Sequence, residues 1–549
     1  MRRNRSAQNW PPSRGCDGRA MKPVLKTSES DPLRIDPVSM DGVKGRIGLT
    51  FCPGKKDKYS ARGPWDRDLG ADLNVVQSFG AVALVTLMEN SELQEVKVPP
   101  EELRAGAAAH GLEWHHLPIQ DLDTRDEHFE DLWTYSGMRL RKLLAHGRNV
   151  VVHCRGGVGR TGMVGARLLV ELGLEPVEAI RRVRAAKPGS IETRDQEKHV
   201  LGCRKVASPG AGLTYAERFL GCLLGGAVGD AFGYCVEFLQ LSEIRYAFGP
   251  EGIKEPVYQE RKLIVSDDTQ MTLFTLEGVL NGLKEPSPQL QTLVESIRLS
   301  YLDWLATQGT SYSDARKRKD SWLAHCAELN VPRAPGTTCV SSLMHGGHGT
   351  IENPLNDSKG CGGAMRSAPV GLFRRFDPKL AFELGARSAA ITHGHPSGYL
   401  SAGTVAAIVR CLMDGMDIHA ATEESLQILE GWDEHEETLH VVAKALDTAQ
   451  FASKDHPTAI DAIGGGWVGE EALAIALYAV LAAGSYVEAT RIASNHDGDS
   501  DSTASIAGQL WGAWKGIMGI PYEWITRLDV LVPLVHLGRR VFAPFAPNG

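Results

Sequence analysis

Residues 149–173, NVVVHCRGGVGRTGMVGARLLVELG, decide the fold of the first part of the chain. The first six residues contain a run of three valines, which is typical of a buried strand. Residues 163–173 have helical periodicity and end at Gly173, where a helix C-cap favours glycine. A glycine-rich turn that starts after Cys154 joins the two. A strand, a tight turn and a helix in this order predict a parallel-rich sheet with helices between its strands.

The same alternation extends from about residue 45 to about residue 206, so we expect an α/β domain over 45–206. AVALVTLM (81–88) and LEWHHLPI (112–119) predict two more buried strands, and MRLRKLLAHG (138–147) predicts a helix that ends at Gly147. Residues 1–30 hold seven Lys and Arg against two acids and no apolar run. We therefore expect residues 1–44 to form a disordered basic tail.

The pattern changes after a Ser, Pro and Gly linker, ASPGAGL (207–213). Ala, Leu and Gly dominate from there on and β-branched runs almost disappear, which predicts an all-α domain over 214–549. Gly221, Gly225, Gly229 and Gly233 recur at every fourth residue. This spacing places them on one face of a helix, where a second backbone can approach closely.

Composition excludes several classes of protein. The 549 residues are 43% hydrophobic with a formal net charge of −8, as in a folded protein of more than one domain without a basic surface for nucleic acid. The longest apolar run, 472–484, is shorter than the ~20 residues of a membrane helix. The ten cysteines contain no C-x-x-C pair, which argues against structural zinc and for reduced thiols. We expect a cytoplasmic protein that binds neither nucleic acid nor a membrane.

The turn after Cys154 is predicted to bind an anion. Gly156, Gly157 and Gly159 allow successive N–H groups to point inward, the following helix start adds positive potential, and Arg160 can hold two phosphate oxygens. The same field favours the thiolate of Cys154, which is a nucleophile. A Walker-A loop is the competing interpretation, but Arg160 stands where that loop requires lysine.

The string H-C-x5-R-T at 153–161 resembles the Cys-dependent protein phosphatases, especially the small dual-specificity type related to the cyclin-dependent-kinase-associated phosphatase. The resemblance covers about 45–206. It implies a phosphocysteine at Cys154, oxyanion binding by Arg160, Thr161 steadying the leaving thiolate, no metal, and a phosphoprotein or other phosphomonoester as substrate. It also implies a general acid on an upstream loop, for which Asp121 in LPIQDLD is the first choice and Asp123 the fallback.

Two short acidic clusters stand before apolar helical runs in the second domain. SDDT (266–269) precedes MTLFTLEGVL, and DSDST (499–503) precedes ASIAGQLWGA. Each cluster alone is explained as a helix N-cap. Together their four carboxylates, flanked by hydroxyls, are the ligands that Mg²⁺ or Mn²⁺ prefers, and the scarcity of histidine argues against zinc.

Four further strings accompany these clusters: LGCLLGGAVGDAFGYCVEF (220–238), KGCGGAMRSAPVG (359–371), THGHP (392–396) and IGGGWVGEEALAIALY (463–478). Over 211–530 the chain resembles the ADP-ribosylglycohydrolase family, which includes the dinitrogenase-reductase-activating glycohydrolase and the ADP-ribosylarginine hydrolases. The resemblance implies an all-α fold with a centre of two Mg²⁺ or Mn²⁺ ions that cleaves the bond between ADP-ribose and an acceptor side chain. GCGGAMRS and HDGDSDST are most similar to the arginine-directed members, which favours an arginine-linked substrate and leaves serine-linked, free-nucleotide and O-acetyl substrates open.

The resemblance also assigns residues by position. Glu237 matches the active-site glutamate, a base or proton shuttle. The turn at Gly360, Gly362 and Gly363 would offer N–H groups to the diphosphate, and His393 is either on the adenosine-ribose side or a structural histidine. The implied metal ligands are Ser266, Asp267, Asp268, Asp499, Asp501 and Ser502.

The leading hypothesis is a bifunctional hydrolase that removes phosphate through Cys154 and ADP-ribose through the metal centre. Its substrates would be a phosphoprotein and an ADP-ribosylated protein or small ADP-ribosyl compound. A first alternative is an active glycohydrolase whose N-terminal domain only binds phosphate. A second alternative is a non-enzymatic, crystallin-like relative, against which the presence of all four metal carboxylates argues.

Overall fold

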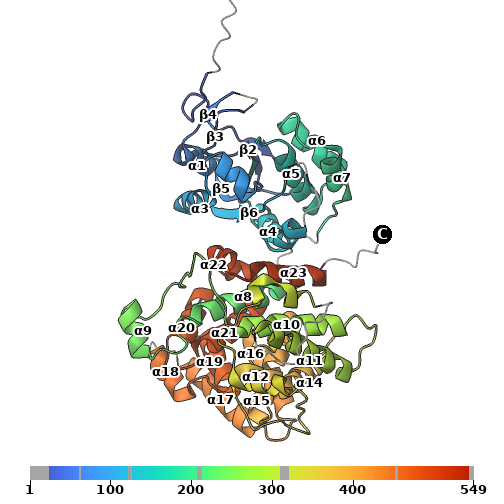
Figure 1. The fold of residues 1–549 in the computed structure, drawn as a ribbon, viewed down its shortest axis with the longest axis vertical. Helices are drawn as coiled ribbons and strands as arrows, with labels where there is room; N and C mark the ends of the chain where they lie inside the picture. The colour runs from blue at the N-terminus through green and yellow to red at the C-terminus, as the bar shows by residue number, and fades with distance from the viewer. Residues whose placement is uncertain are drawn as a thin grey trace, which may run out of the picture. The chain divides into compact units, whose positions relative to one another are not determined.

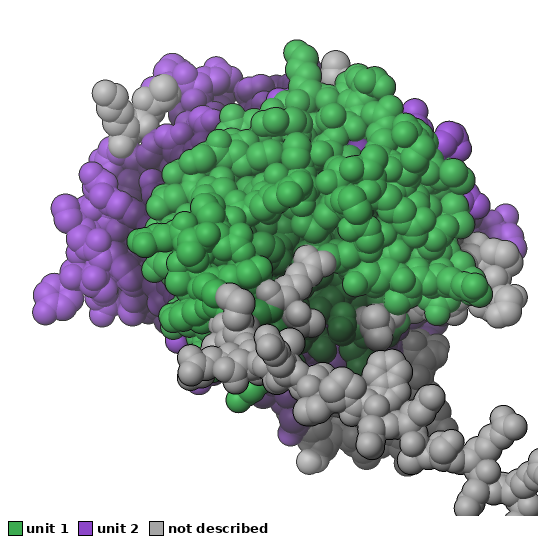
Figure 2. Space-filling view, turned by 90° about the horizontal axis from the view of Figure 1, so that it is seen from above, with its two compact units in different colours: residues 1–124, 147–167, 176–202 green, residues 125–146, 168–175, 203–549 purple. Residues whose placement is uncertain are grey.

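The computed structural model describes residues 24–60, 63–121, 123, 127–206, 213–309, 321–451 and 455–542. These residues form two compact units, coloured separately in Figure 2. The first comprises residues 1–124, 147–167 and 176–202, and the second comprises residues 125–146, 168–175 and 203–549. The predicted arrangement of an α/β domain followed by an all-α domain is confirmed. Most of the predicted linker, 207–212, lies outside the described residues.

The first unit is built on a five-stranded sheet with the strand order β1-β2-β7-β5-β6 (Figure 1). Strands β2, β7, β5 and β6 are parallel, and β1 pairs with β2 in the antiparallel sense. The register places Phe51 of β2 opposite Cys154 of β7, so Cys154 ends a central strand. The strands are β1 Asp36–Val38, β2 Ile47–Phe51, β5 Ala81–Thr86, β6 Glu113–His116 and β7 Asn149–Cys154, with a separate pair β3 Lys56–Asp57 and β4 Trp65–Asp66.

Helices alternate with these strands as predicted. Helices α1 and α3 contact β5 and β6, whereas α6 contacts β1. Gly147 and Gly173 have φ values of +81° and +114°, the left-handed conformation expected of a glycine that follows a helix. The helices that contribute to this unit are α1 Leu69–Ser78, α2 Asn90–Glu95, α3 Pro100–Ala109, α5 Gly159–Glu171, α6 Pro176–Ala186 and α7 Arg194–Gly202.

The prediction of a disordered tail over 1–44 is wrong for its last part. Residues 36–38 form β1, which pairs with β2 at the edge of the sheet. Leu33 and Val38 are buried, and the Asp36 carboxylate is bound by Arg34 and Lys187 at 2.7 and 2.8 Å. The pairing with β2 and the ion pair with Lys187 hold the strand, since its three residues DPV carry no strand pattern of their own. Residues 1–23 lie outside the described residues.

The second unit is helical throughout its described elements. Helix α4 (Glu127–Ala145) belongs to it, and Asp131 of α4 accepts hydrogen bonds from Arg539 and His536 of α23. Two segments of the predicted first domain, 125–146 and 168–175, thus group with the second unit. The other helices up to residue 413 are α8 Tyr215–Gly233, α9 Leu241–Phe248, α10 Asp267–Gly282, α11 Leu290–Thr307, α12 Thr337–Met344, α13 Ala368–Gly371, α14 Pro378–Ala390 and α15 Pro396–Met413.

The remaining helices continue to the C-terminal end of the described chain. They are α16 Ile418–Leu429, α17 Glu436–Gln450, α18 His456–Ile463, α19 Gly469–Ala482, α20 Tyr486–Ser494, α21 Ser500–Lys515, α22 Tyr522–Arg527 and α23 Leu531–Phe542.

Helices α8 and α21 cross with their backbones in contact. A methyl group on Gly221, Gly225, Gly229 or Gly233 would overlap the backbone carbonyl of Gly512, Gly508, Ala504 or Ser500, respectively. The predicted close approach at the four-residue glycine spacing is therefore confirmed. The crossing brings the C-terminal end of α8 next to the N-terminal end of α21, and both acidic motifs of the second domain are adjacent to it.

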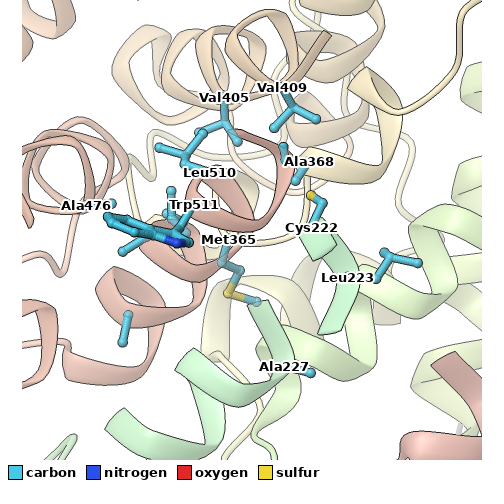
Figure 3. Packing of buried hydrophobic residues seen from close by; sticks show 14 of the residues in the cluster. Cys222, Leu223, Ala227, Met365, Ala368, Val405, Val409, Ala476, Leu510 and Trp511 are labelled. Atoms are coloured by element: carbon cyan, nitrogen blue, oxygen red, sulfur yellow. The ribbon is translucent and has the colours of Figure 1, made fainter. Parts of the chain in front are cut away.

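The hydrophobic core surrounds this crossing. Figure 3 shows Cys222, Leu223 and Ala227 of α8 in one cluster with Leu510 and Trp511 of α21. Helix α19, which covers residues 472–482 of the longest apolar run, is buried in the same core. None of the helices among the described residues has both the length and the apolar character needed to cross a membrane.

Candidate active sites

Cys154 lies at the C-terminal end of β7, immediately before the glycine-rich turn and helix α5. Its side chain is buried, and the backbone N–H of Gly157 donates a hydrogen bond of 3.2 Å to its sulfur. Gly157 has φ +72°, and a Cβ there would overlap the backbone of Thr50. Only glycine fits this position, because the turn folds back against β2 at Gly157, whose N–H points to Cys154.

Arg160, the second residue of α5, is fixed by a carboxylate that was not predicted from the sequence. Its Nη1 and Nη2 donate to Oε2 and Oε1 of Glu92 at 2.6 and 2.8 Å, and Nη1 also donates to the carbonyl of Ile119 at 2.8 Å. Burial alone would raise the pKa of Glu92, but the hydrogen bonds and charge of Arg160 hold that pKa below its usual value. The guanidinium is thereby oriented and charged.

Asp121 lies over the same site. Its Oδ1 is 3.2 Å from Nη2 of Arg160, and its side chain is 70% exposed. Asp121, Cys154 and Arg160 line one cavity of about 1330 Å³, together with Gly156 of the turn. The fallback acid, Asp123, is absent from the described lining of this cavity. An exposed carboxyl at the mouth of a nucleophile's cavity has the position that a general acid needs.

Two other predicted residues are buried beneath the turn. Gly159 packs against Glu192 and Gln196, which leave no room for a Cβ. Among the described atoms, the hydroxyl oxygen of Thr161 is buried and has no hydrogen-bond partner. The sulfur of Cys154 thus accepts its hydrogen bond from the backbone N–H of Gly157. Thr161 was predicted to steady the leaving thiolate, and in this structure its hydroxyl makes no hydrogen bond to that sulfur.

His153 links strand β7 to the neighbouring strand β5. Its Nε2 lies 2.7 Å from the hydroxyl of Thr86, which also accepts a hydrogen bond of 2.8 Å from the Trp114 indole. Since the Thr86 hydroxyl accepts from Trp114, its own hydrogen is available to Nε2. Burial lowers the pKa of His153 to about 3, so this histidine is neutral at physiological pH.

The second site gathers carboxylates from three places in the helical unit. Glu237 follows α8, Asp267 and Asp268 begin α10, and Asp499 and Asp501 lie at the start of α21. Burial is the largest of the effects that raise the pKa of Glu237 to about 9, and repulsion by Asp499, Asp267 and Asp230 contributes to the same rise. Burial and the neighbouring carboxylates likewise raise the pKa of Asp267, to about 7, and of Asp268 and Asp501. These carboxylates therefore share one buried region.

The first acidic segment is held by Asp230, a residue of α8 to which the sequence analysis gave no role. The Asp230 carboxylate accepts the backbone N–H groups of Ser266 and Thr269 at 2.9 and 3.0 Å, and the hydroxyl of Thr269. Ser266 caps α10 by accepting the N–H of Asp268 at 3.2 Å. Asp267 accepts the N–H of Gly336 at 3.1 Å. Ser266 thus caps the helix, while the hydrogen bonds of Asp230 hold in position the segment that carries the carboxylates of Asp267 and Asp268.

The second acidic segment is a cap as well. Asp499 is the N-cap of α21, and the N–H of Ser502 donates to Oδ1 of Asp499 and to Oδ1 of Asp501 at 3.2 and 2.9 Å. The thiol of Cys361 donates to the other oxygen of Asp499 at 2.9 Å. The hydroxyl of Ser502 lies 3.5 Å from the same sulfur.

The donor chemistry of this region fits a hard divalent cation. Among the described atoms, Oε2 of Glu237 and Oδ2 of Asp268 are buried and have no hydrogen-bond partner. Several buried carboxylates that repel one another, with two oxygens left unsatisfied, require a positive charge that no described Lys or Arg donates to them. In the described ranges, no three or more His, Cys, Asp and Glu side chains converge on a single metal-binding position. The carboxylates thus supply suitable donors in one region without forming a closed coordination shell.

The glycine-rich turn 360–363 borders the acidic region through Cys361. The N–H of Gly360 donates to the Ser358 hydroxyl at 3.3 Å, and the N–H of Cys361 donates to the Trp467 carbonyl at 3.2 Å. Gly362 and Gly363 are buried. The N–H of Gly360, predicted to face a diphosphate, is therefore already bonded within the turn.

His393 packs beneath this turn. Its ring lies against Gly360 and Gly362, its Nδ1 is 2.8 Å from the Thr392 hydroxyl, and its side chain is buried. Burial and the charge of Arg366 lower its pKa to about 3. This environment is that of the structural histidine, one of the two predicted roles.

Comparison with known proteins assigns the helical unit. The family model described as ADP-ribosylglycohydrolase matches residues 211–547, which is more than half of the chain. The chain belongs to the ADP-ribosylglycohydrolase family. The matched range contains both acidic segments, Glu237 and the turn 360–363. The whole second site therefore lies within the residues that this family model matches.

A second family model, described as the Swiss Army Knife protein DSP-PTPase phosphatase domain, matches residues 68–200 of this ADP-ribosylglycohydrolase family member. That range contains Glu92, Asp121, Cys154 and Arg160. The predicted combination of an ADP-ribosylglycohydrolase domain with a dual-specificity phosphatase domain is confirmed.

Individual relatives match one domain each. The ADP-ribosyl-[dinitrogen reductase] glycohydrolase of Rhodospirillum rubrum is 25% identical over 58% of this chain and 92% of its own length. Cyclin-dependent kinase inhibitor 3 of Rattus norvegicus is 29% identical over 31% of this chain and 79% of its own. A solved structure titled ADP-ribosylglycohydrolase-related protein complex is 24% identical over 59% of this chain and 98% of its own, with a TM-score of 0.41.

Three residues of this ADP-ribosylglycohydrolase family member escaped the sequence analysis: Glu92, Asp230 and Cys361. Asp230 and Cys361 lie inside quoted motifs, GDAFG and KGCGG, but their partners are distant in sequence. The sequence did offer one signal for Asp230: it is an acidic residue one turn before Gly233, on the helix whose glycine face was predicted to pack closely. The sequence offered no such signal for Glu92, since the segment ENSELQE (89–95) indicates only the start of a helix.

Proposed function

We propose that the chain is a bifunctional hydrolase that removes ADP-ribose from arginine side chains and phosphate from phosphomonoesters. The observation that carries the first activity is the buried group of carboxylates with two unsatisfied oxygens, on Glu237 and Asp268, within the range of the family model. The observation that carries the second is Cys154 in the glycine turn with Arg160 and Asp121 over it.

Two Mg²⁺ or Mn²⁺ ions would be held in the glycohydrolase site by the residues of the two acidic segments: Ser266, Asp267, Asp268, Asp499, Asp501 and Ser502. When bound, such ions supply Lewis acidity and a template for the ribose hydroxyls. Asp230 and the Cys361 thiol fix the two carboxylate segments in position, as described above. Glu237, whose Oε2 lacks a partner among the described atoms, would orient a water and receive its proton once the positive charge of the bound ions has lowered the pKa of Glu237. Water oxygen then bonds to the anomeric carbon, the C–N bond breaks, and the departing guanidine nitrogen takes up a proton.

In the phosphatase site, the sulfur of Cys154 bonds to phosphorus as the ester P–O bond breaks. Protonated Asp121 gives its proton to the leaving oxygen, and Arg160 with the turn N–H groups binds the equatorial oxygens. Water then cleaves the phosphocysteine and restores the thiolate. No metal takes part in these steps.

ADP-ribose release from ADP-ribosylarginine, with and without Mg²⁺, tests the glycohydrolase proposal. We expect activity that excess EDTA abolishes and that Asp267→Ala or Asp501→Ala removes together with divalent-ion affinity. Asp447→Asn, an exposed acid on α17, is the matched control. Undiminished turnover in EDTA would reduce both acidic segments to helix caps, and faster release from ADP-ribosylserine would reject the arginine preference.

Hydrolysis of an aryl phosphate in EDTA tests the phosphatase proposal. We expect turnover that Cys154→Ser abolishes while ADP-ribose release stays unchanged. Binding of phosphotyrosine peptide without turnover would instead favour a phosphate-binding domain that has no catalytic role.

A further inference from the structure

A further carboxylate, that of Glu192, lies in the cavity of Cys154. Glu192 lines the same cavity of about 1330 Å³ as the nucleophile, and its side chain is exposed. Its Oε2 lies against Gly159, the residue of the glycine-rich turn at which α5 begins. Arg160 forms its ion pairs with two other carboxylates. Glu192 is therefore a carboxylate beside the anion-binding turn that takes no part in orienting the guanidinium.

The backbone next to Glu192 is held in a strained conformation. Ile191 has φ +62°, a left-handed conformation that a buried, β-branched residue rarely adopts. The guanidinium of Arg184 donates hydrogen bonds of 3.1 and 3.2 Å to the carbonyls of Ser190 and Ile191. The N–H of Glu192 donates to Oε1 of the buried Gln196 at 2.9 Å. These contacts fix the backbone from which the Glu192 side chain reaches the turn.

The charge of Glu192 opposes substrate binding. A phosphomonoester is an anion, and a carboxylate beside the turn repels it. After the ester bond has broken, however, the site holds a phosphocysteine and needs a water molecule that gives up a proton. A carboxylate suits this later step, because it can accept a hydrogen bond from the water and then its proton. The position of Glu192 thus fits hydrolysis of the intermediate better than its formation.

We propose that Glu192 is the general base for hydrolysis of the phosphocysteine. The inference rests on the proposed phosphatase function of Cys154. The water oxygen bonds to phosphorus while the P–S bond breaks, and the sulfur of Cys154 leaves as the thiolate. The proton of the water goes to a carboxylate oxygen of Glu192 and passes to solvent when phosphate departs. Asp121 protonates the leaving oxygen in the first step, so each of the two carboxyl groups serves one step.

Steady-state kinetics of the full-length protein with an aryl phosphate test this assignment. In Glu192→Gln the first step is intact and the second is slowed by ~10²–10⁴, the usual contribution of a general base. We expect kcat and KM to fall together with kcat/KM unchanged, because kcat/KM reports only the steps up to release of the aryl alcohol. Asp121→Ala should instead lower kcat/KM. Asp195→Asn, an exposed acid of α7 that pairs with Lys198, is the matched control and should change neither constant.

Mass spectrometry of rapidly denatured protein measures the intermediate directly. Glu192→Gln should release aryl alcohol in a burst of about one equivalent and carry a phosphoryl group on Cys154. The Asp195→Asn control should carry none. Formate should speed the loss of this group in Glu192→Ala, since a small carboxylate can take the place of the missing base.

Three results would contradict the assignment in different ways. Turnover by Glu192→Gln at the parent rate without phosphocysteine would overturn it and leave Asp121 as acid and base of both steps. An equal fall in kcat and kcat/KM would show that Glu192 only shapes the turn, which also overturns it. If the parent protein releases no aryl alcohol, even in a first burst, the proposed phosphatase function fails and the role of Glu192 fails with it.

Discussion

The thiol of Cys361 donates a hydrogen bond of 2.9 Å to Oδ2 of Asp499, across 138 residues of sequence. The N–H of Ser502 holds the other oxygen of the same carboxylate at 3.2 Å. Between them these two donors fix the rotation of Asp499 and limit which of its lone pairs are free. Orientation of this kind matters because a carboxylate binds a cation best when its own hydrogen bonds hold it in place.

Removing the thiol should therefore loosen the proposed metal site. We expect Cys361→Ala to weaken divalent-ion affinity by ~10-fold, the loss typical for a residue that supports a metal ligand. Cys361→Ser, which keeps a donor at that position, should retain most of the affinity. The measurement is the Mn²⁺ or Mg²⁺ concentration at half-maximal ADP-ribose release. Equal concentrations for the parent protein and Cys361→Ala would show that the hydrogen bond has no role in metal binding.

Glu92 should be required for phosphatase efficiency because its carboxylate accepts two of the guanidinium hydrogen bonds that orient Arg160. We expect Glu92→Gln to lower kcat/KM for an aryl phosphate by roughly 10–100-fold, as for the loss of a charged hydrogen-bonded pair. Glu95→Gln, one turn away and paired with the half-buried Arg155, is the matched control. A similar loss in the control would mean that general surface charge, and not the orientation of Arg160, matters.

The choice between the two candidate acids can be settled by pH profiles. Asp121→Ala should slow aryl phosphate hydrolysis by ~10²–10⁴ and remove the fall in rate at high pH, because the protonated acid is lost. Asp123→Ala should leave the profile unchanged. The reverse result would assign the general acid to Asp123, despite its absence from the described cavity wall.

His153 should make the first unit less stable in acid. Its pKa is lowered to about 3 in the fold against 6.5 in the unfolded chain, so the unfolded state binds the proton more readily. Stability from this residue is complete above pH 6.5 and falls by about 1.4 kcal/mol for each pH unit between 6.5 and 3. Hydrogen exchange in β7 of the parent protein and of His153→Asn, at pH 4.5 and 7, measures this difference. An equal pH dependence in both proteins would contradict the assignment.

The helix crossing should not tolerate a single methyl group. Gly229→Ala places its Cβ against the carbonyl of Ala504, so we expect a loss of ~1–3 kcal/mol in the free energy of unfolding, despite the higher helix propensity of alanine. Gly202→Ala, at the end of α7 with no heavy atom within 4 Å of the added Cβ, is the control and should be neutral or stabilising. Urea unfolding of both variants checks this, and equal stabilities would indicate that the crossing can shift without cost.

The sequence predicted correctly those elements whose structure depends on residues close together in the chain. Strand β7, the turn after Cys154 and the glycine face of α8 follow from short-range spacing and were found from the sequence. Strand β1 was missed because Asp36 and Val38 are held by partners elsewhere in the first unit, including Lys187.

The missed site residues have the same explanation. Glu92 meets Arg160 across 68 positions, and Asp230 meets Thr269 across 39. A carboxylate gives no signal in its own segment of which distant N–H group or guanidinium it will bind. Tertiary geometry was needed to find these residues, although the motif resemblance had already located the regions in which they lie.

The backbone contact between α8 and α21 has a consequence for how this protein can vary. The separation between the end of α8 and the start of α21 is set where Gly233 meets the carbonyl of Ser500, with no side chain between them. Core side chains on the other faces of both helices can be exchanged for others of similar volume, and the gap across which Asp230 and Asp501 lie stays the same. Substitutions in the core are therefore expected to leave the spacing of the acidic groups unchanged.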